Sequence, residues 1–164
     1  MKRLLLFFGV LALLGTANAQ IFQSENFDGA ALPGGWTTTA IAGVDTWVFG
    51  LNSPDAANAG NFNGTPMAMF DDDWGGGQAG SAAPSTSELI SPMVDITGAT
   101  QAMLSFDYNY FHLGSSSFTV DVWNGSGWIN VLTENSVSNC GAWGCSPYPH
   151  FEMDVTAHAN DSFQ

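Results

Sequence analysis

The residues best suited to metal chemistry are three adjacent carboxylates, Asp71, Asp72 and Asp73, followed closely by the glycine run 75–77. Adjacent carboxylates repel one another, which costs folding free energy unless water or a cation relieves it. Calcium takes roughly six to eight oxygen ligands, and a glycine-rich loop can turn its carbonyls toward such an ion. The spacing is not that of an EF-hand loop. The run therefore predicts either a calcium site or a solvated acidic loop, and the charge balance of the chain favours calcium.

Positive charge is confined to the first three residues. The chain has 15 Asp and Glu residues, whereas its two cationic side chains other than histidine are Lys2 and Arg3. A basic start, an apolar run and an Ala-Asn-Ala end are typical of a secretory signal peptide over residues 1–19, cleaved before Gln20. The apolar run is too short for an ordinary transmembrane helix. We therefore expect a secreted or cell-surface protein without a membrane span, formed by residues 20–164.

The composition describes a folded acidic domain. Hydrophobic residues make up 45% of the chain and charged residues 10%, which is the opposite of the balance in disordered acidic tails. A surface that carries carboxylates without Lys or Arg repels nucleic acids and anionic lipids and attracts metal cations. Nucleic-acid binding is therefore excluded as an expected function.

The two cysteines, Cys140 and Cys145, lie close together in the chain. In an exported protein such a pair is expected to form a disulfide, here one that closes a small surface loop. Two further soft ligands at metal-binding spacing are absent from the sequence, so a zinc site is not expected.

Three aromatic residues in predicted loops are candidates for ligand binding: Trp74, Trp143 and Tyr148. An aromatic ring can stack on the apolar face of a sugar while neighbouring polar groups accept its hydroxyls. Simple packing within the loops is the alternative interpretation of these rings.

Common catalytic motifs are missing from the sequence. It contains no G-x-S-x-G motif, no phosphate-binding loop and no dinucleotide fingerprint, and its histidines, His112, His150 and His158, form no metal-ligand pattern. A glycosidase needs only two carboxylates about 5–10 Å apart, but no pair stands out. We therefore expect a non-catalytic protein, with an accessory domain of a secreted protease or other hydrolase as the alternative.

Short β-rich runs alternate with clusters of Gly, Pro, Asn, Ser and Asp, which is typical of an all-β domain. The clearest element is a hairpin over 118–133, with its turn at 124–127 and with Phe118, Val120 and Val122 on one face. Further strands are predicted at 45–49, 66–70, 88–96 with an interruption at Pro92, 103–111 and 150–155.

Long loops and a late strand complete the expected architecture. Residues 51–87 are rich in small and polar residues and are interpreted as loops around the strand at 66–70. Several antiparallel strands with long connections favour an antiparallel β-sandwich, a single domain over 20–164. A new strand begins at 161–164, so we expect the chain to be truncated and the sandwich to lack its last strand or strands.

Seven short segments, in order, carry a family resemblance that spans most of residues 20–164. They are Glu25-Asn26-Phe27-Asp28, Leu32-Pro33-Gly34-Gly35-Trp36, Thr46-Trp47, Asp73-Trp74, Ser87-Glu88-Leu89-Ile90-Ser91-Pro92, Leu104-Ser105-Phe106-Asp107-Tyr108 and Phe151-Glu152-Met153-Asp154-Val155-Thr156. Their order resembles the secreted jelly-roll domains of the cleaved-adhesin type found beside proteases of Bacteroidetes and, more distantly, MAM-like domains of the choice-of-anchor type.

The resemblance implies a jelly-roll sandwich, an extracellular setting, structural Ca²⁺ and binding or adhesion rather than catalysis. It also implies a metal near Glu25 and Asp28, and Asp154 could join them if the terminal strands pair; otherwise these are ordinary surface carboxylates. The expected function is therefore that of a calcium-organised binding or adhesion module that recognises an extracellular glycan or protein.

Overall fold

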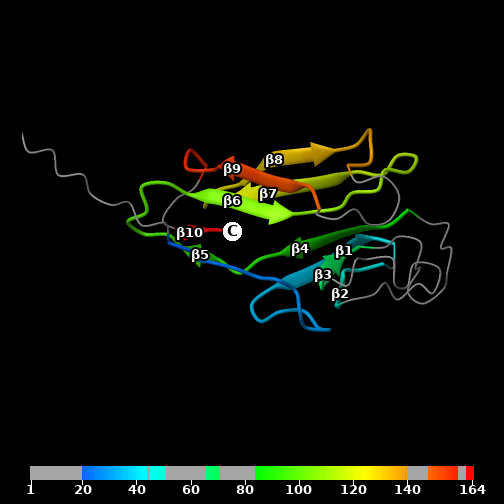
Figure 1. Cartoon of the computed structure of the whole chain (residues 1–164), viewed down its shortest axis with the longest axis horizontal. Coiled ribbons are helices and arrows are strands. Elements are labelled where there is room, and N and C mark those ends of the chain that lie inside the picture. The colour runs from blue at the N-terminus through cyan, green and yellow to red at the C-terminus, as the bar shows by residue number, and fades with distance from the viewer. Residues whose placement is uncertain (1–19, 44, 51–65, 71–83, 140–147, 159–161) are drawn as a thin grey trace, which may run out of the picture.

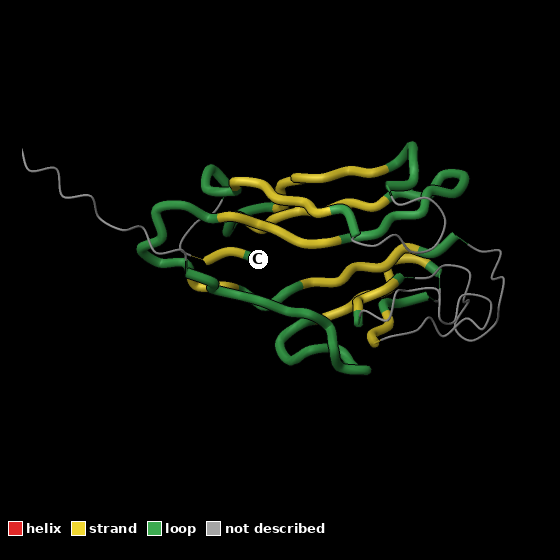
Figure 2. Tube along the Cα trace, in the orientation of Figure 1, coloured by secondary structure: helices red, strands yellow, loops and turns green. Residues whose placement is uncertain are grey.

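The computed structural model of the chain is shown in Figure 1 and describes residues 20–43, 45–50, 66–70, 84–139, 148–158 and 162–164. Every regular element in these residues is a β-strand, and turns and loops connect the strands (Figure 2). The same residues contain no helix that is long and apolar enough to cross a membrane. The expected all-β fold is confirmed.

Ten short strands occur among the described residues. They are β1 (Thr37–Ala42), β2 (Val48–Gly50), β3 (Met67–Met69), β4 (Thr86–Ile90), β5 (Val94–Asp95), β6 (Met103–Asp107), β7 (Phe118–Trp123), β8 (Trp128–Glu134), β9 (His150–Asp154) and β10 (Ser162–Phe163).

The strands form five antiparallel pairs: β1–β4, β2–β3, β5–β10, β6–β9 and β7–β8. In Figure 1 the strands β6 to β9 lie in one layer and β1 to β5 in a second layer that faces it. The fold is therefore β-sandwich-like. β10 pairs with β5, and the carbonyl of Gln164 accepts a hydrogen bond of 2.8 Å from the backbone N–H of Trp123, at the end of β7. The end of the chain thus contacts both layers.

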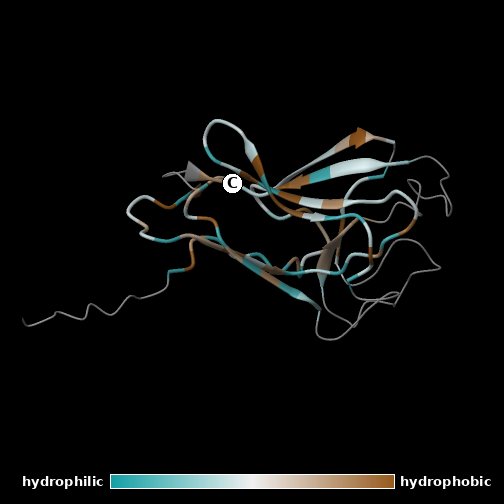
Figure 3. Ribbon diagram, turned by 90° about the horizontal axis from the view of Figure 1, so that it is seen from above, coloured by the Kyte–Doolittle hydropathy of each residue, from teal (hydrophilic) through white to brown (hydrophobic). Residues whose placement is uncertain are grey.

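An aromatic cluster fills the inner face of the layer formed by β6 to β9. Phe106 stacks on Phe151 with ring centroids 4.9 Å apart, and Tyr108 stacks on Phe118 at 5.6 Å. Successive strand residues point to opposite faces, so Phe106 and Tyr108 lie on the same face of the sheet. The alternation of hydrophobic and hydrophilic residues is visible along the strands in Figure 3. Val122, also on this face, is almost completely buried.

A second aromatic cluster joins the segment before β1 to β2. Phe27 meets Trp36 edge to face at 5.1 Å and stacks on Phe49 at 6.0 Å. Trp47 lies 6.1 Å from Phe70, which follows β3. These contacts explain why the segment 20–36, which contains no strand, is nevertheless held against the sheet.

Several sequence-based predictions agree with the strands in detail. The hairpin over 118–133 is confirmed as β7 and β8, and the interruption at Pro92 separates β4 from β5. The strand expected at 103–111 ends at Asp107, so that prediction was too long. β1 was not predicted, because its sequence TTTAIA is mostly exposed and shows no alternation of apolar residues.

Candidate functional site

The predicted site residues divide into two groups. Those outside the described residues are Asp71, Asp72, Asp73, Trp74, Cys140, Trp143 and Cys145. The structure places Glu25, Asp28, Tyr148 and Asp154.

Glu25 and Asp28 lie in a compact loop before β1. Oε1 of Glu25 accepts a hydrogen bond of 2.7 Å from the backbone N–H of Phe27, and Phe27 adopts a left-handed conformation with φ of 54°. Oδ2 of Asp28 accepts a long hydrogen bond of 3.4 Å from the amide of Asn26. A positive φ is uncommon for a bulky residue, and here it directs the Phe27 ring onto Trp36. The Glu25 carboxylate thus helps to fix the turn that carries Phe27.

Asp154 ends β9 on the exposed face of the β6–β9 pair. Its Oδ1 accepts a hydrogen bond of 2.9 Å from the backbone N–H of Thr156. Its Oδ2 accepts a hydrogen bond of 2.9 Å from the side-chain amide of Gln101. Hydrogen bonds from Thr156, followed by that from Gln101, lower the pKa of the Asp154 carboxyl. Both oxygens are therefore engaged in closing the turns beside this strand.

The three carboxylates do not converge on a metal site. β9 pairs with β6 and not with the segment that contains Glu25 and Asp28. Within the described ranges, no three side chains among His, Cys, Asp and Glu are grouped so that they could hold a metal ion.

Tyr148 lies just before β9 and is half-buried. Its hydroxyl is completely buried and has no hydrogen-bond partner among the described residues, and this burial raises the pKa of the phenol. In this position the hydroxyl cannot reach a ligand at the surface.

Sequence reasoning missed the most deeply buried carboxylate of the described residues, Asp45, which has an exposed fraction of 0%. The Ser85 hydroxyl donates to its Oδ2, and Asp45 makes a further interaction besides this one. Gly43 has a positive φ of 75°, and a Cβ atom at this position would overlap Ser85. The glycine therefore permits the close approach of the two turns. The sequence signal that could have indicated this buried carboxylate is a single acidic residue just before a short apolar strand.

Two loops beyond β6 and β8 are joined by hydrogen bonds, and we call residues 110–117 and 135–139 the paired loops. The N–H of Tyr110 donates to Oδ1 of Asn139 at 2.8 Å, and the N–H of Asn139 donates back to the Tyr110 carbonyl at 3.1 Å. The N–H of His112 donates to the Ser138 hydroxyl at 2.9 Å. Such bonds hold the two loops in one arrangement.

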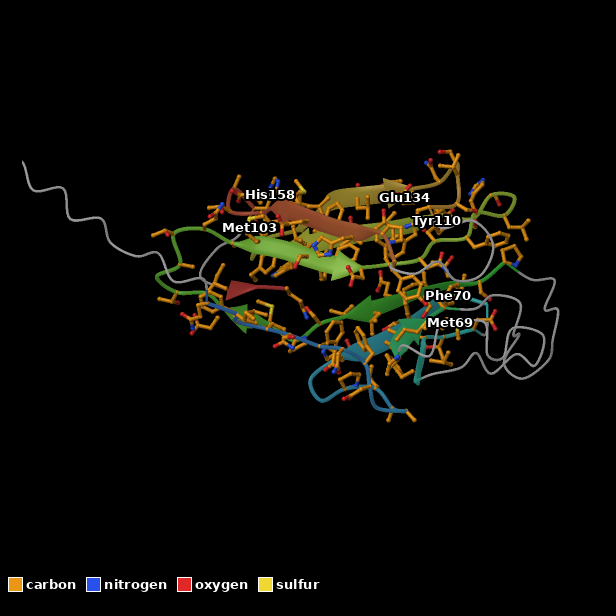
Figure 4. The ribbon with its side chains drawn as sticks, in the orientation of Figure 1. Met69, Phe70, Met103, Tyr110, Glu134 and His158 are labelled. Carbon is orange, nitrogen blue, oxygen red and sulfur yellow. The ribbon has the colours of Figure 1, made fainter. Side chains whose placement is uncertain are left out.

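Tyr110 anchors the first of the paired loops from within. Its hydroxyl donates to the Ser116 carbonyl at 2.7 Å and lies 2.9 Å from Nδ1 of His112. The same hydroxyl lies 3.1 Å from the hydroxyl of Ser116, so it has three polar contacts within this loop. Figure 4 shows Tyr110 and Glu134 at the end of the molecule that also carries Met69 and Phe70, opposite the end with Met103 and His158.

The paired loops present apolar side chains to solvent. Leu113 is 66% exposed and Val137 is 65% exposed, and Phe111, in the first of the two loops, is exposed as well. Exposed apolar residues that are gathered on a fixed surface mark sites of interaction more often than isolated ones do.

Among the described residues, Asp107 and His150 form the one pair that resembles a catalytic acid–base pair. Oδ1 of Asp107 lies 2.7 Å from Nδ1 of His150, an arrangement that orients the imidazole and leaves Nε2 available as a base. However, the two side chains are 64% and 55% exposed on the open face of β6 and β9. Water therefore solvates both groups, and catalysis by such a pair needs an enclosed site.

No protein-family model, no curated protein and no solved structure matches the chain in the comparisons.

Proposed function

We propose that the protein is a secreted, non-catalytic binding or adhesion module with a jelly-roll sandwich, and that it recognises an extracellular glycan or protein. The observation that carries this proposal is the surface of the paired loops. Their backbone is fixed by reciprocal hydrogen bonds between Tyr110 and Asn139, while Leu113 and Val137 remain exposed. A surface that is already ordered loses little conformational entropy when a partner binds.

Calcium is the cofactor that we propose for the acidic loops. Asp71, Asp72 and Asp73 supply adjacent oxygen ligands, and residues 20–164 contain no Lys or Arg to compensate them. The proposed role of the ion is structural: it cross-links carboxylate-bearing loops and so orders the surface that meets the partner.

The binding proposal is tested with the secreted protein on a panel of glycans and extracellular matrix proteins. Leu113→Ser and Val137→Ser remove exposed apolar contact area, so each is expected to weaken binding by about fivefold or more. Ile21→Ser is the matched control, because Ile21 is even more exposed but adjoins a different surface, beside residues 97–101. Equal binding by all four proteins would contradict a role for the paired loops.

The calcium proposal is tested by thermal unfolding at constant ionic strength, with calcium and with an excess of EDTA. A bound ion that prefers the folded state raises the midpoint, and its removal lowers it. Readdition of calcium, but not of sodium at equal ionic strength, is expected to restore the midpoint. An identical midpoint in both conditions would exclude a structural calcium ion.

A further inference from the structure

The outer face of the β7–β8 hairpin carries three cross-strand pairs that neither the loops nor the core use. In order along the hairpin they are Thr119 with Thr133, Asp121 with Asn130, and Trp123 with Trp128. The opposite face of the same strands carries Val122, which is 2% exposed, so the three pairs face away from the core. We call this surface the β7–β8 platform.

The polar part of the platform is fixed by its own hydrogen bonds. The Asn130 amide donates to Oδ1 of Asp121 at 2.9 Å and to the Leu132 carbonyl at 3.1 Å, and its Oδ1 accepts the Thr133 hydroxyl at 2.9 Å. Oδ2 of Asp121 accepts no hydrogen bond from the residues that the structure describes. The platform therefore offers an oriented carboxylate oxygen to a ligand that can donate a hydroxyl.

The aromatic part of the platform is Trp123 and Trp128, and the turn between these two residues holds them in place. The ring centroids of Trp123 and Trp128 lie 5.5 Å apart at an interplanar angle of 59°, and Trp128 remains 48% exposed. Oδ1 of Asn124 accepts the N–H groups of Ser126 and Gly127 at 3.0 Å and 2.9 Å, which closes the turn. Half of a large indole is thus presented to solvent in a defined orientation, beside the carboxylate of Asp121.

We propose that the β7–β8 platform binds an uncharged saccharide, with one sugar ring stacked on Trp128 and a hydroxyl of the sugar donating to Asp121. The apolar C–H face of a pyranose suits an aromatic ring, and its hydroxyls suit a row of carboxylate, amide and hydroxyl groups. The charge of the chain selects among sugars: with 15 acidic side chains and no Lys or Arg beyond residue 3, sulfated and uronic-acid glycans are repelled.

This inference rests on the proposed binding function and gives it a ligand class and a second surface. The competing explanation is that the two tryptophans only stabilise the hairpin, since aromatic cross-strand pairs contribute to sheet stability by themselves. The two explanations differ in what they require at position 128. Hairpin packing accepts any large apolar side chain, whereas sugar stacking requires an aromatic ring.

The test is calorimetric titration of the secreted protein with neutral hexasaccharides of glucose, xylose, mannose and N-acetylglucosamine, and with anionic polygalacturonate, all with calcium present. At least one neutral sugar is expected to bind, and Trp128→Leu is expected to weaken it about fivefold or more. Trp128→Phe should retain most of the affinity, and Asp121→Asn should lower it about threefold. Ile21→Ser, the exposed control beside residues 97–101, should leave this affinity unchanged.

Three results would overturn the inference: no neutral sugar binds, polygalacturonate alone binds, or Trp128→Leu binds as well as the unmodified protein. Melting midpoints of the variants identify any that are unfolded. If Trp128→Leu is among them, Asp121→Asn decides in its place, because it is expected to lose about threefold in affinity. Failure of the platform does not remove the proposed function. Sugar binding that is lost in Leu113→Ser but kept in Trp128→Leu would assign the ligand to the paired loops, and binding of proteins alone would leave the module with a protein partner.

Discussion

The Ser85 hydroxyl donates to Oδ2 of the completely buried Asp45 and so joins the residue before β4 to the turn after β1. Removal of one partner from a buried hydrogen bond leaves the other unsatisfied, at a cost of about 1–3 kcal/mol. We therefore expect Asp45→Ala and Ser85→Ala each to lower the free energy of unfolding by that amount in a urea titration.

The double variant separates this bond from the other contact of Asp45. If the two side chains interact, the loss in Asp45→Ala/Ser85→Ala is smaller than the sum of the single losses by about 0.5–3 kcal/mol. A strictly additive double variant would show that the hydrogen bond contributes nothing to stability. Ser87→Ala is a suitable control, because the Ser87 hydroxyl donates to an exposed backbone carbonyl of the same strand pair.

Asp154 is predicted to make the stability of the fold depend on pH. Hydrogen bonds from Thr156 and Gln101 lower the pKa of its carboxyl from the ordinary value of 3.8. A depressed pKa in the folded state stabilises the protein above the unfolded pKa, and this contribution disappears as the pH falls through the folded pKa. The melting midpoint of Asp154→Asn should therefore lie below that of the unmodified protein at pH 6, and the difference should shrink as the pH falls below about 4.

Asp95 provides an independent check of the same effect. The N–H of Thr97 donates to its Oδ1 at 2.9 Å and lowers the pKa of this carboxyl. Asp95→Asn is expected to show the same dependence on pH as Asp154→Asn. A difference between variant and unmodified protein that stays constant from pH 6 to pH 2.5 would contradict the assignment.

The Asp107–His150 pair is predicted to contribute little to stability despite its distance of 2.7 Å. More than half of each side chain is exposed, and exposed ion pairs contribute about 0–1 kcal/mol because water and salt screen them. Asp107→Asn should therefore change the free energy of unfolding by less than about 1 kcal/mol at pH 6 and by less still in 1 M salt. A loss of several kcal/mol would mean that the pair is shielded from solvent in solution.

The elements that could be predicted from the sequence are those determined locally. The β7–β8 hairpin combines alternation of apolar residues with an Asn-Gly turn, and both signals lie within its own residues. The break between β4 and β5 follows from Pro92, which cannot donate to a sheet. Neither element depends on a distant partner, and both predictions are confirmed.

The missed features depend on contacts between distant parts of the chain. β1 shows no apolar alternation and becomes a strand through its pairing with β4, in which Thr37 lies opposite Ile90. The buried Asp45 accepts a hydrogen bond from Ser85, which lies 40 positions away in the sequence. The same holds for the paired loops, in which Tyr110 meets Asn139. Residue type alone could not distinguish these side chains from exposed ones.

Two tyrosine hydroxyls with opposite surroundings provide a matched test of the paired loops. The Tyr110 hydroxyl donates to the Ser116 carbonyl and contacts Nδ1 of His112, whereas the buried Tyr148 hydroxyl has no partner in the part of the chain that the structure describes. Tyr110→Phe should lower the free energy of unfolding by about 1–3 kcal/mol, because the Ser116 carbonyl and the His112 ring lose their partner. Tyr148→Phe should be neutral or stabilising, since it removes an unpaired polar group from the interior.

Binding distinguishes the two variants further. If the anchored loop forms the binding surface, Tyr110→Phe should weaken binding of a glycan or protein partner even at a temperature where the variant is fully folded, because an ordered surface must first be restored. Tyr148→Phe should bind like the unmodified protein. Equal stability and equal binding of both variants would show that the Tyr110 hydroxyl does not order the loop, and would assign that role to the bonds between Tyr110 and Asn139 alone.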